Sequence, residues 1–145
     1  MARSEASVNI KRPVDRVFAY TMEVKNWPKW QTSMMEPEQT SEEPIGVGTT
    51  LRWIFHVMGN RVKSSAKVTE YELNKKWSMN VVGGAAVFEV QWFFNPIEGG
   101  TKVTLRQDMK VGGFSKLVFP LLAISLRNNS KVALNNIKNI LEAQT

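Results

Sequence analysis

Residues 126–142 read LRNNSKVALNNIKNILE, and this stretch decides how the rest of the chain can fold. Its apolar side chains recur at helical spacing, while charged and amide side chains fill the other side of the same helix. The apolar stripe consists of Leu126, Ala133, Ile137, Ile140 and Leu141. A helix with one apolar face has to bury that face, so the preceding residues must supply a broad apolar surface.

Several upstream segments alternate apolar and polar residues at period two, as half-buried antiparallel strands do. The predicted strands span residues 4–10, 34–40, 51–57, 62–68, 77–81, 88–94 and 103–109. Turns are expected at Gly59-Asn60 and at the glycine pairs that begin at Gly83, Gly99 and Gly112. A curved sheet wrapped around one helix encloses volume, and we expect the function to reside in that volume.

Short helices are expected between the first two strands. Pro13 suits a first helical turn and is followed by an apolar stripe that includes Val17 and Phe18. Residues 26–30 form a second short helical or turn segment. Near the start of the long helix, Pro120 leaves two interpretations open. Residues 114–119 form a mobile lid over a cavity, or Pro120 simply occupies the first turn of an ordinary helix.

Composition narrows the class of protein. The 145 residues fit a single domain, 1–145, and the chain has no cysteine. This excludes disulfides, thiolate zinc sites and cysteine nucleophiles, and fits a reducing compartment. The amino terminus lacks a signal-peptide pattern, and the longest apolar run, residues 117–124, is far shorter than the ~20 residues of a membrane span. We therefore expect a soluble, cytoplasmic protein without a transmembrane segment.

The formal charge is +6, but the basic residues are dispersed and form no long run. We favour a solvated surface over a nucleic-acid partner. A basic interaction module that uses an exposed Trp27 and a lysine-rich outer strand is kept as a further alternative. Nothing in the sequence indicates an oligomeric state.

The order of the motifs resembles the START-like (SRPBCC) superfamily, most closely its polyketide cyclase/dehydrase-like branch. The motifs that carry the resemblance are residues 13–18 (PVDRVF), 27–30 (WPKW), 46–49 (GVGT), 68–71 (VTEY), 100–105 (GTKVTL) and 137–142 (IKNILE). The resemblance implies an α+β helix-grip fold, in which a seven-stranded antiparallel sheet curls around the long C-terminal helix. It places two short helices between the first two strands and a cavity between sheet and helix. It also implies a hydrophobic small-molecule partner, such as a lipid or a polyketide-like metabolite, without transferring a catalytic mechanism.

Strand phase and the resemblance together select the candidate ligand contacts, most of which are aromatic residues and methionines on the predicted concave face. They are Trp30, Trp53, Phe55, Tyr71, Met79, Phe88, Trp92, Gln107, Met109, Phe119 and Leu122. The competing interpretation is that these side chains only fill the core. Tyr71 reaches this face only if a bulge shifts it inward. Gln107 is the best candidate for a specificity contact, although we favour a backbone or water partner for its amide.

Catalysis has little support in the sequence. The single histidine, His56, phases outward, as do Glu89 and Asp108. No nucleophile elbow, phosphate loop or metal-binding cluster is recognisable, so we assign no catalytic residue, no metal and no cofactor. The alternative to simple ligand binding is a cyclase or dehydratase that acts on a bound polyketide-like substrate.

Overall fold

The computed structural model describes residues 2–57, 59–111 and 119–144. Its strands are β1 (Ala2–Ile10), β2 (Met34–Gln39), β3 (Thr50–Val57), β4 (Asn60–Glu72), β5 (Lys76–Gly83), β6 (Ala86–Ile97) and β7 (Gly100–Val111). Its helices are α1 (Val14–Met22), the 3₁₀ helix η1 (Val24–Asn26), α2 (Trp27–Trp30) and α3 (Phe119–Ala143). Every predicted strand is present, and most extend beyond the alternating segment that predicted them.

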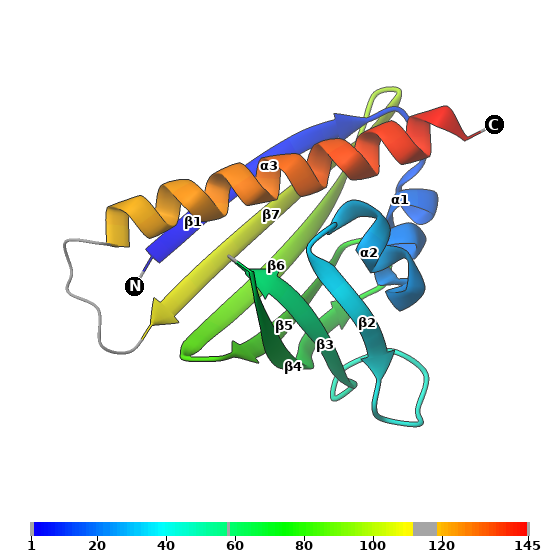
Figure 1. Ribbon diagram of the computed structural model, residues 1–145. Helices are drawn as coiled ribbons and strands as arrows, with labels where there is room; N and C mark the ends of the chain where they lie inside the picture. The colour runs from blue at the N-terminus through cyan, green and yellow to red at the C-terminus, as the bar shows by residue number, and fades with distance from the viewer. Residues whose placement is uncertain (1, 58, 112–118, 145) are drawn as a thin grey trace.

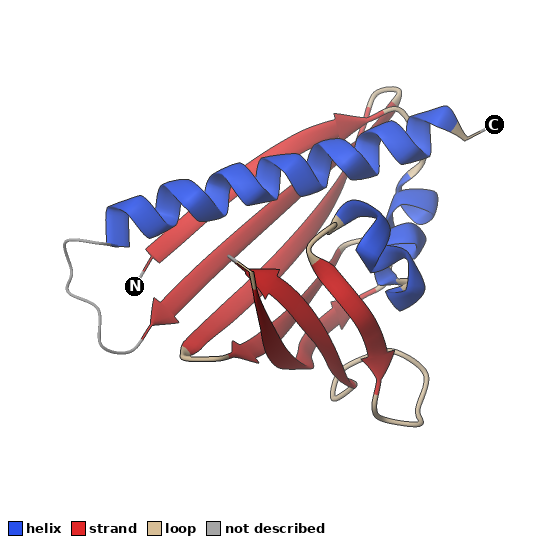
Figure 2. Ribbon diagram, in the orientation of Figure 1, coloured by secondary structure: helices blue, strands red, loops and turns tan. Residues whose placement is uncertain are grey.

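The strands form one seven-stranded sheet in the order β1-β7-β6-β5-β4-β3-β2, and each neighbouring pair is antiparallel. The first strand therefore pairs with the last, with Val8 opposite Val103. Helix α3 runs along β1 and β7 on the concave side of the sheet, and α1 and α2 lie toward its C-terminal end (Figure 1). Figure 2 shows the same division, with the helices on the inner side of the curled sheet. The predicted helix-grip fold is confirmed.

The far edge of the sheet is interrupted. In β2 the register shifts between Met35 and Glu38, and Glu36 adopts a positive φ of 51°. Pro37 follows and has no backbone N–H to donate. A bulge and a proline on an edge strand limit pairing with another chain, so this edge is poorly suited to extending the sheet.

A stack of tryptophans forms the centre of the core. The rings of Trp27 and Trp77 lie nearly parallel with centroids 5.9 Å apart, and Trp77 stacks on Trp92 at 5.5 Å. The prediction of an exposed Trp27 is wrong, because only 1% of this residue is accessible. Helix α2 is a single turn pressed against the sheet, and the Trp27 indole N–H donates to the Thr21 carbonyl over 2.7 Å.

Helix α3 begins at Phe119, which places Pro120 in the first turn. Proline fits this position because the first backbone N–H groups of a helix have no partner within it. Of the two interpretations of Pro120, the structure therefore has the ordinary helix start, with the proline in the first turn. The predicted lid lies mostly in residues 114–118, which are outside the described residues.

The C-terminal end of α3 is tied to the link between β1 and α1. The Arg12 guanidinium donates to the carbonyl oxygens of Glu142 (2.8 Å) and Gln144. The Lys11 backbone N–H donates to Glu142 Oε2 over 2.9 Å, and Lys138 Nζ donates to the Asn9 carbonyl over 2.8 Å. Cations stabilise the carbonyl end of a helix, so these contacts hold α3 in place over the sheet.

Among the described residues, no helix has both the length and the apolar character that crossing a membrane requires.

Candidate functional site

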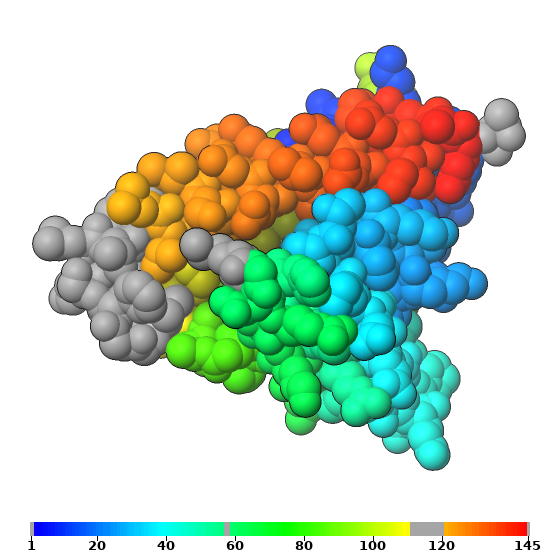
Figure 3. Space-filling model, in the orientation of Figure 1, coloured from blue at the N-terminus to red at the C-terminus, as the bar shows by residue number. Residues whose placement is uncertain are grey.

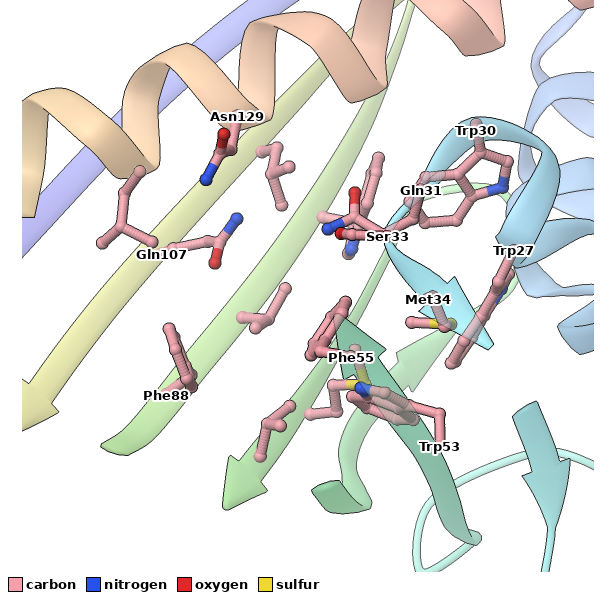
Figure 4. Close-up of a pocket in the computed structure, with 16 residues that line it drawn as sticks. Trp27, Trp30, Gln31, Ser33, Met34, Trp53, Phe55, Phe88, Gln107 and Asn129 are labelled. Carbon is pink, nitrogen blue, oxygen red and sulfur yellow. The ribbon is translucent and has the colours of Figure 1, made fainter. Parts of the chain in front are cut away.

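The inner side of the sheet, α2 and α3 enclose a cavity of about 220 Å³ (Figure 4). Most of its lining is aromatic or aliphatic. The lining residues are Trp27, Trp30, Gln31, Ser33, Met34, Trp53, Phe55, Met79, Val81, Phe88, Val90, Trp92, Leu105, Gln107, Leu126 and Asn129. Its volume is below the roughly 300–1,000 Å³ that is usual for ligand pockets, which favours a compact ligand.

Most of the sequence-predicted site residues meet at this cavity. Those that line it are Trp30, Trp53, Phe55, Met79, Phe88, Trp92 and Gln107. They come from α2 and from strands β3, β5, β6 and β7, so the alternation within each strand brought them to one face. Whether they contact a ligand remains a prediction.

The other predicted residues do not line it. Tyr71 turns inward next to a register shift between Val68 and Glu70, but its ring packs edge-on against Phe18, with centroids 5.6 Å apart. Met109 and Leu122 belong to a separate apolar cluster with Ala2 and Leu126. Met109 lies on the inner face of β7, as predicted, but it is two residues beyond Gln107 and does not line the cavity. The Phe119 side chain is outside the described part of the chain.

Sequence reasoning missed several lining residues. Gln31 and Ser33 lie in the turn between α2 and β2, where no periodicity indicates direction. Asn129 could have been found, because helical spacing places it on the stripe between Leu126 and Ala133. A polar residue in an otherwise apolar stripe marks a position where the helix faces something polar.

Aromatic rings form a rigid wall at one end of the cavity. Trp30 meets Trp92 edge-on at 5.4 Å, and Trp53 meets Phe55 edge-on at 5.9 Å. The indole N–H groups of Trp30, Trp53 and Trp92 are buried and have no hydrogen-bond acceptor among the described residues. Such interlocked rings offer large contact area with little freedom to rearrange.

Polar groups gather at the other end, between β7 and α3. Gln107 Nε2 donates to the Ser130 hydroxyl over 3.1 Å, and Ser130 is fully buried. Asn129 precedes Ser130 and lines the cavity. In Figure 4 the Gln107 oxygen and the Asn129 nitrogen face the enclosed space, with Gln31 and Ser33 across from them. The predicted backbone or water partner of Gln107 is instead a serine side chain.

These polar groups also mark an entrance. Asn129 and Ser33 are exposed, and Gln31, Phe55 and Phe88 are partly exposed. Figure 3 shows this face of the molecule, with α3 drawn orange and the β3–β4 hairpin drawn green. A small molecule could enter between these two elements.

No ionisable side chain lines the cavity among the described residues. His56 and Glu89 are exposed, as their phase predicted. Asp108, on the other face of β7, pairs with Arg3 at 2.6 Å, and this hydrogen bond raises the pKa of Arg3. No group of three metal-binding side chains occurs in the described ranges. The described cavity can bind and orient a molecule, but it offers no proton donor or acceptor that titrates near neutral pH.

Comparison with known proteins places the fold in context. A family model described as polyketide cyclase/dehydrase and lipid transport matches residues 1–142. No curated protein matches this sequence.

Solved structures share the architecture at low identity. TTHA0849 from Thermus thermophilus is 21% identical with a TM-score of 0.82, and the match covers 99% of each chain. The ZhuI aromatase/cyclase from Streptomyces sp. R1128 is 15% identical with a TM-score of 0.80, over 97% of this chain and 93% of that one. The di-domain aromatase/cyclase BexL of the BE-7585A pathway is 17% identical with a TM-score of 0.80, over 98% of this chain and 47% of BexL. At these identities the similarity establishes the fold alone.

Proposed function

The chain belongs to the polyketide cyclase/dehydrase and lipid transport family, and on that basis we propose that it binds a hydrophobic small molecule in the cavity between its sheet and α3. The observation that carries this proposal is the cavity itself, about 220 Å³ that the surrounding side chains leave unfilled. Protein interiors are normally close-packed, so a concave space of this size with a mostly apolar lining is typical of a ligand site.

The lining supports an apolar ligand. Burial of apolar surface stabilises a complex by roughly 25 cal/mol per Å², and the aromatic wall supplies much of that surface. The walls are positioned by the sheet and by α2, so binding requires little ordering of the protein. We propose that residues 1–145 act as one binding domain in the cytoplasm, a reducing compartment to which a chain without cysteine is suited.

A cyclase is the second candidate, favoured by the family description and by the fold shared with ZhuI. Because the described lining has no ionisable group, such an enzyme would direct cyclisation by shape and by hydrogen bonds from neutral amides. It predicts that the protein changes the distribution of ring products from a linear poly-β-ketone. An unchanged distribution rejects this candidate and leaves the binding proposal standing.

The alternative of a basic interaction module relied on an exposed Trp27, but Trp27 is buried in the core and cannot contact a partner. Nothing else in the described residues favours it over ligand binding.

The binding proposal is tested by replacing a side chain that lines the cavity with a larger one, which should exclude a probe ligand. N-Phenyl-1-naphthylamine is an uncharged fluorophore whose emission rises in apolar sites. We expect it to bind the wild-type protein and to be excluded by Val90→Phe, because Val90 lines the cavity and is only 8% exposed.

Val87→Phe is the matched control, since Val87 lies on the outer face of the same strand and is 48% exposed. Phe88→Trp narrows the partly exposed edge of the cavity with less strain on the core. Circular dichroism checks that each variant is folded. Absence of binding by the wild type, or equal binding by all variants, contradicts the proposal.

A further inference from the structure

We propose that the ligand is electrically neutral and carries a carbonyl, hydroxyl or carboxamide group, which Gln107 and Asn129 hold at the α3 end of the cavity. The apolar body of the ligand then lies among the tryptophans. This inference rests on the proposed binding function and adds the chemical class of the ligand.

The first argument is the charge of the lining. The polar groups at the cavity are the amides and hydroxyl of Gln31, Ser33, Gln107 and Asn129 and the indole N–H groups of its tryptophans, all of them uncharged. A carboxylate, phosphate or ammonium drawn past the entrance and buried beside Gln107 would meet no opposite charge among the described residues. Its lost hydration would be repaid only in part by neutral hydrogen bonds. The lining therefore selects against ions, although the whole chain carries a charge of +6.

The second argument is the arrangement of the two amides. They approach from different elements, Gln107 from β7 and Asn129 from α3. The bond to Ser130 draws the Gln107 nitrogen toward the helix, which turns its oxygen to the enclosed space (Figure 4). The Asn129 nitrogen faces the same space. One acceptor and one donor that line the same cavity match a carboxamide or a hydroxyl, and the donor alone matches a carbonyl.

Another neutral polar group lies beside Gln107. Ser4 is directly opposite Gln107 in the β1–β7 register, so both side chains project from the same face of the sheet. Only 4% of Ser4 is exposed, and its hydroxyl has no hydrogen-bond partner among the described residues. Ser4 thus adds a further uncharged polar side chain beside Gln107, whereas the opposite end of the cavity is aromatic. A ligand that fits both ends has an apolar body among the rings and a neutral polar group that reaches Gln107 and Asn129.

The experiment uses four probes built on one bicyclic ring: naphthalene, 2-naphthamide, 2-naphthoate and 2-naphthylmethylammonium. Isothermal titration calorimetry at pH 7.5 measures their affinities for the wild-type protein. We expect 2-naphthamide to bind roughly five-fold tighter than naphthalene, as one or two net hydrogen bonds would give. The two ions should bind roughly a hundred-fold more weakly than the amide.

Variants then locate the preference. Asn129→Leu and Gln107→Leu should each abolish the advantage of 2-naphthamide over naphthalene while naphthalene still binds. Asn128→Leu is the matched control, because Asn128 is the exposed neighbour of Asn129 and does not line the cavity. Because Gln107→Leu also breaks the bond to Ser130, the exposed Asn129 provides the variant with less risk to folding.

The outcomes separate the two proposals. If naphthalene binds but the amide has no advantage, or 2-naphthoate binds as tightly as the amide, the neutral-ligand inference is wrong and the binding function stands. If Asn129→Leu and Gln107→Leu leave the preference unchanged, the assignment to this pair is wrong. If none of the four probes binds, both proposals fall.

Discussion

The side-chain nitrogen of Gln107 lies 3.1 Å from the hydroxyl oxygen of Ser130 and joins β7 to α3 beside the cavity. Ser130 is only 1% exposed, so the hydroxyl has no access to bulk water. Ser130→Ala should lower the free energy of unfolding by about 1 kcal/mol, the net value of one such hydrogen bond. Urea denaturation measures the change. Ser65→Ala, at an exposed position of β4, is the control, and equal stability of the two variants would contradict the assignment.

The contact between β7 and β1 leaves no room for a side chain at Gly100. A Cβ at this position collides with the carbonyl oxygen of Ile10. Gly100→Ala should therefore destabilise the protein by roughly 1–3 kcal/mol, as other overpacking substitutions do. At Gly46 the nearest atom to an added Cβ is 4.0 Å away, so Gly46→Ala should change stability by less than ~0.5 kcal/mol. Matching midpoints in thermal unfolding would show that the strands can separate to admit the methyl group.

The fully buried Thr21 accepts hydrogen bonds from the indole N–H groups of two tryptophans. Its hydroxyl accepts from Trp77 Nε1 over 3.3 Å and donates to the Phe18 carbonyl over 2.9 Å, and its carbonyl accepts from Trp27. Thr21→Val keeps the shape but leaves the Trp77 N–H buried without a partner, which costs about 1–3 kcal/mol. Chemical denaturation followed by tryptophan fluorescence measures this loss. The exposed Thr69 supplies the control Thr69→Val, and a similar small effect at both sites would argue against the Thr21–Trp77 bond.

The Glu142 carboxylate predicts a pH dependence of stability. The pKa of Glu142 is lowered below its ordinary value of 4.5, mainly by a hydrogen bond from the Lys138 side chain and next by one from the Lys11 backbone N–H. A pKa that is lower in the folded state stabilises the fold above the unfolded pKa, and that contribution is lost as pH falls through the folded pKa.

Glu142→Gln removes this titration. Relative to the wild type, the variant should have a lower Tm at pH 7, and the difference should shrink below about pH 4.5 as the wild-type carboxylate takes up a proton. Thermal unfolding by circular dichroism at a series of pH values measures both curves. Glu98→Gln, in the exposed turn between β6 and β7, is the control. A Tm difference that grows on acidification would have the wrong sign.

The strands and the inner face of the sheet were predictable because period-two alternation depends on a single local rule. Trp53, Phe55, Met79, Phe88, Trp92 and Gln107 all reached the cavity for this reason. The alternation also predicted the face of Met109. It could not predict where along β7 the cavity ends, because that depends on how α3 crosses the sheet.

The short elements were less predictable. A single helical turn such as α2 has too few residues for a periodic pattern, so nothing in the sequence distinguished a buried Trp27 from an exposed one. Gln31 and Ser33 line the cavity because of the conformation of the turn that connects α2 to β2. Asn129 and Ser130 carried a readable signal, since both interrupt the apolar stripe of α3.

The pairing of β1 with β7 has a consequence for the growing polypeptide on the ribosome. Ile10 lies opposite Thr101 and Ala2 lies opposite Met109, so the earliest strand waits for its neighbour until nearly the whole sheet has been synthesised. Until β7 has been synthesised, the inward-facing Ala6 and Ile10 have no neighbouring strand on this side. Closure over such a long span of sequence is slow, and a nascent chain that stalls before β7 presents an open strand to chaperones and to other nascent chains.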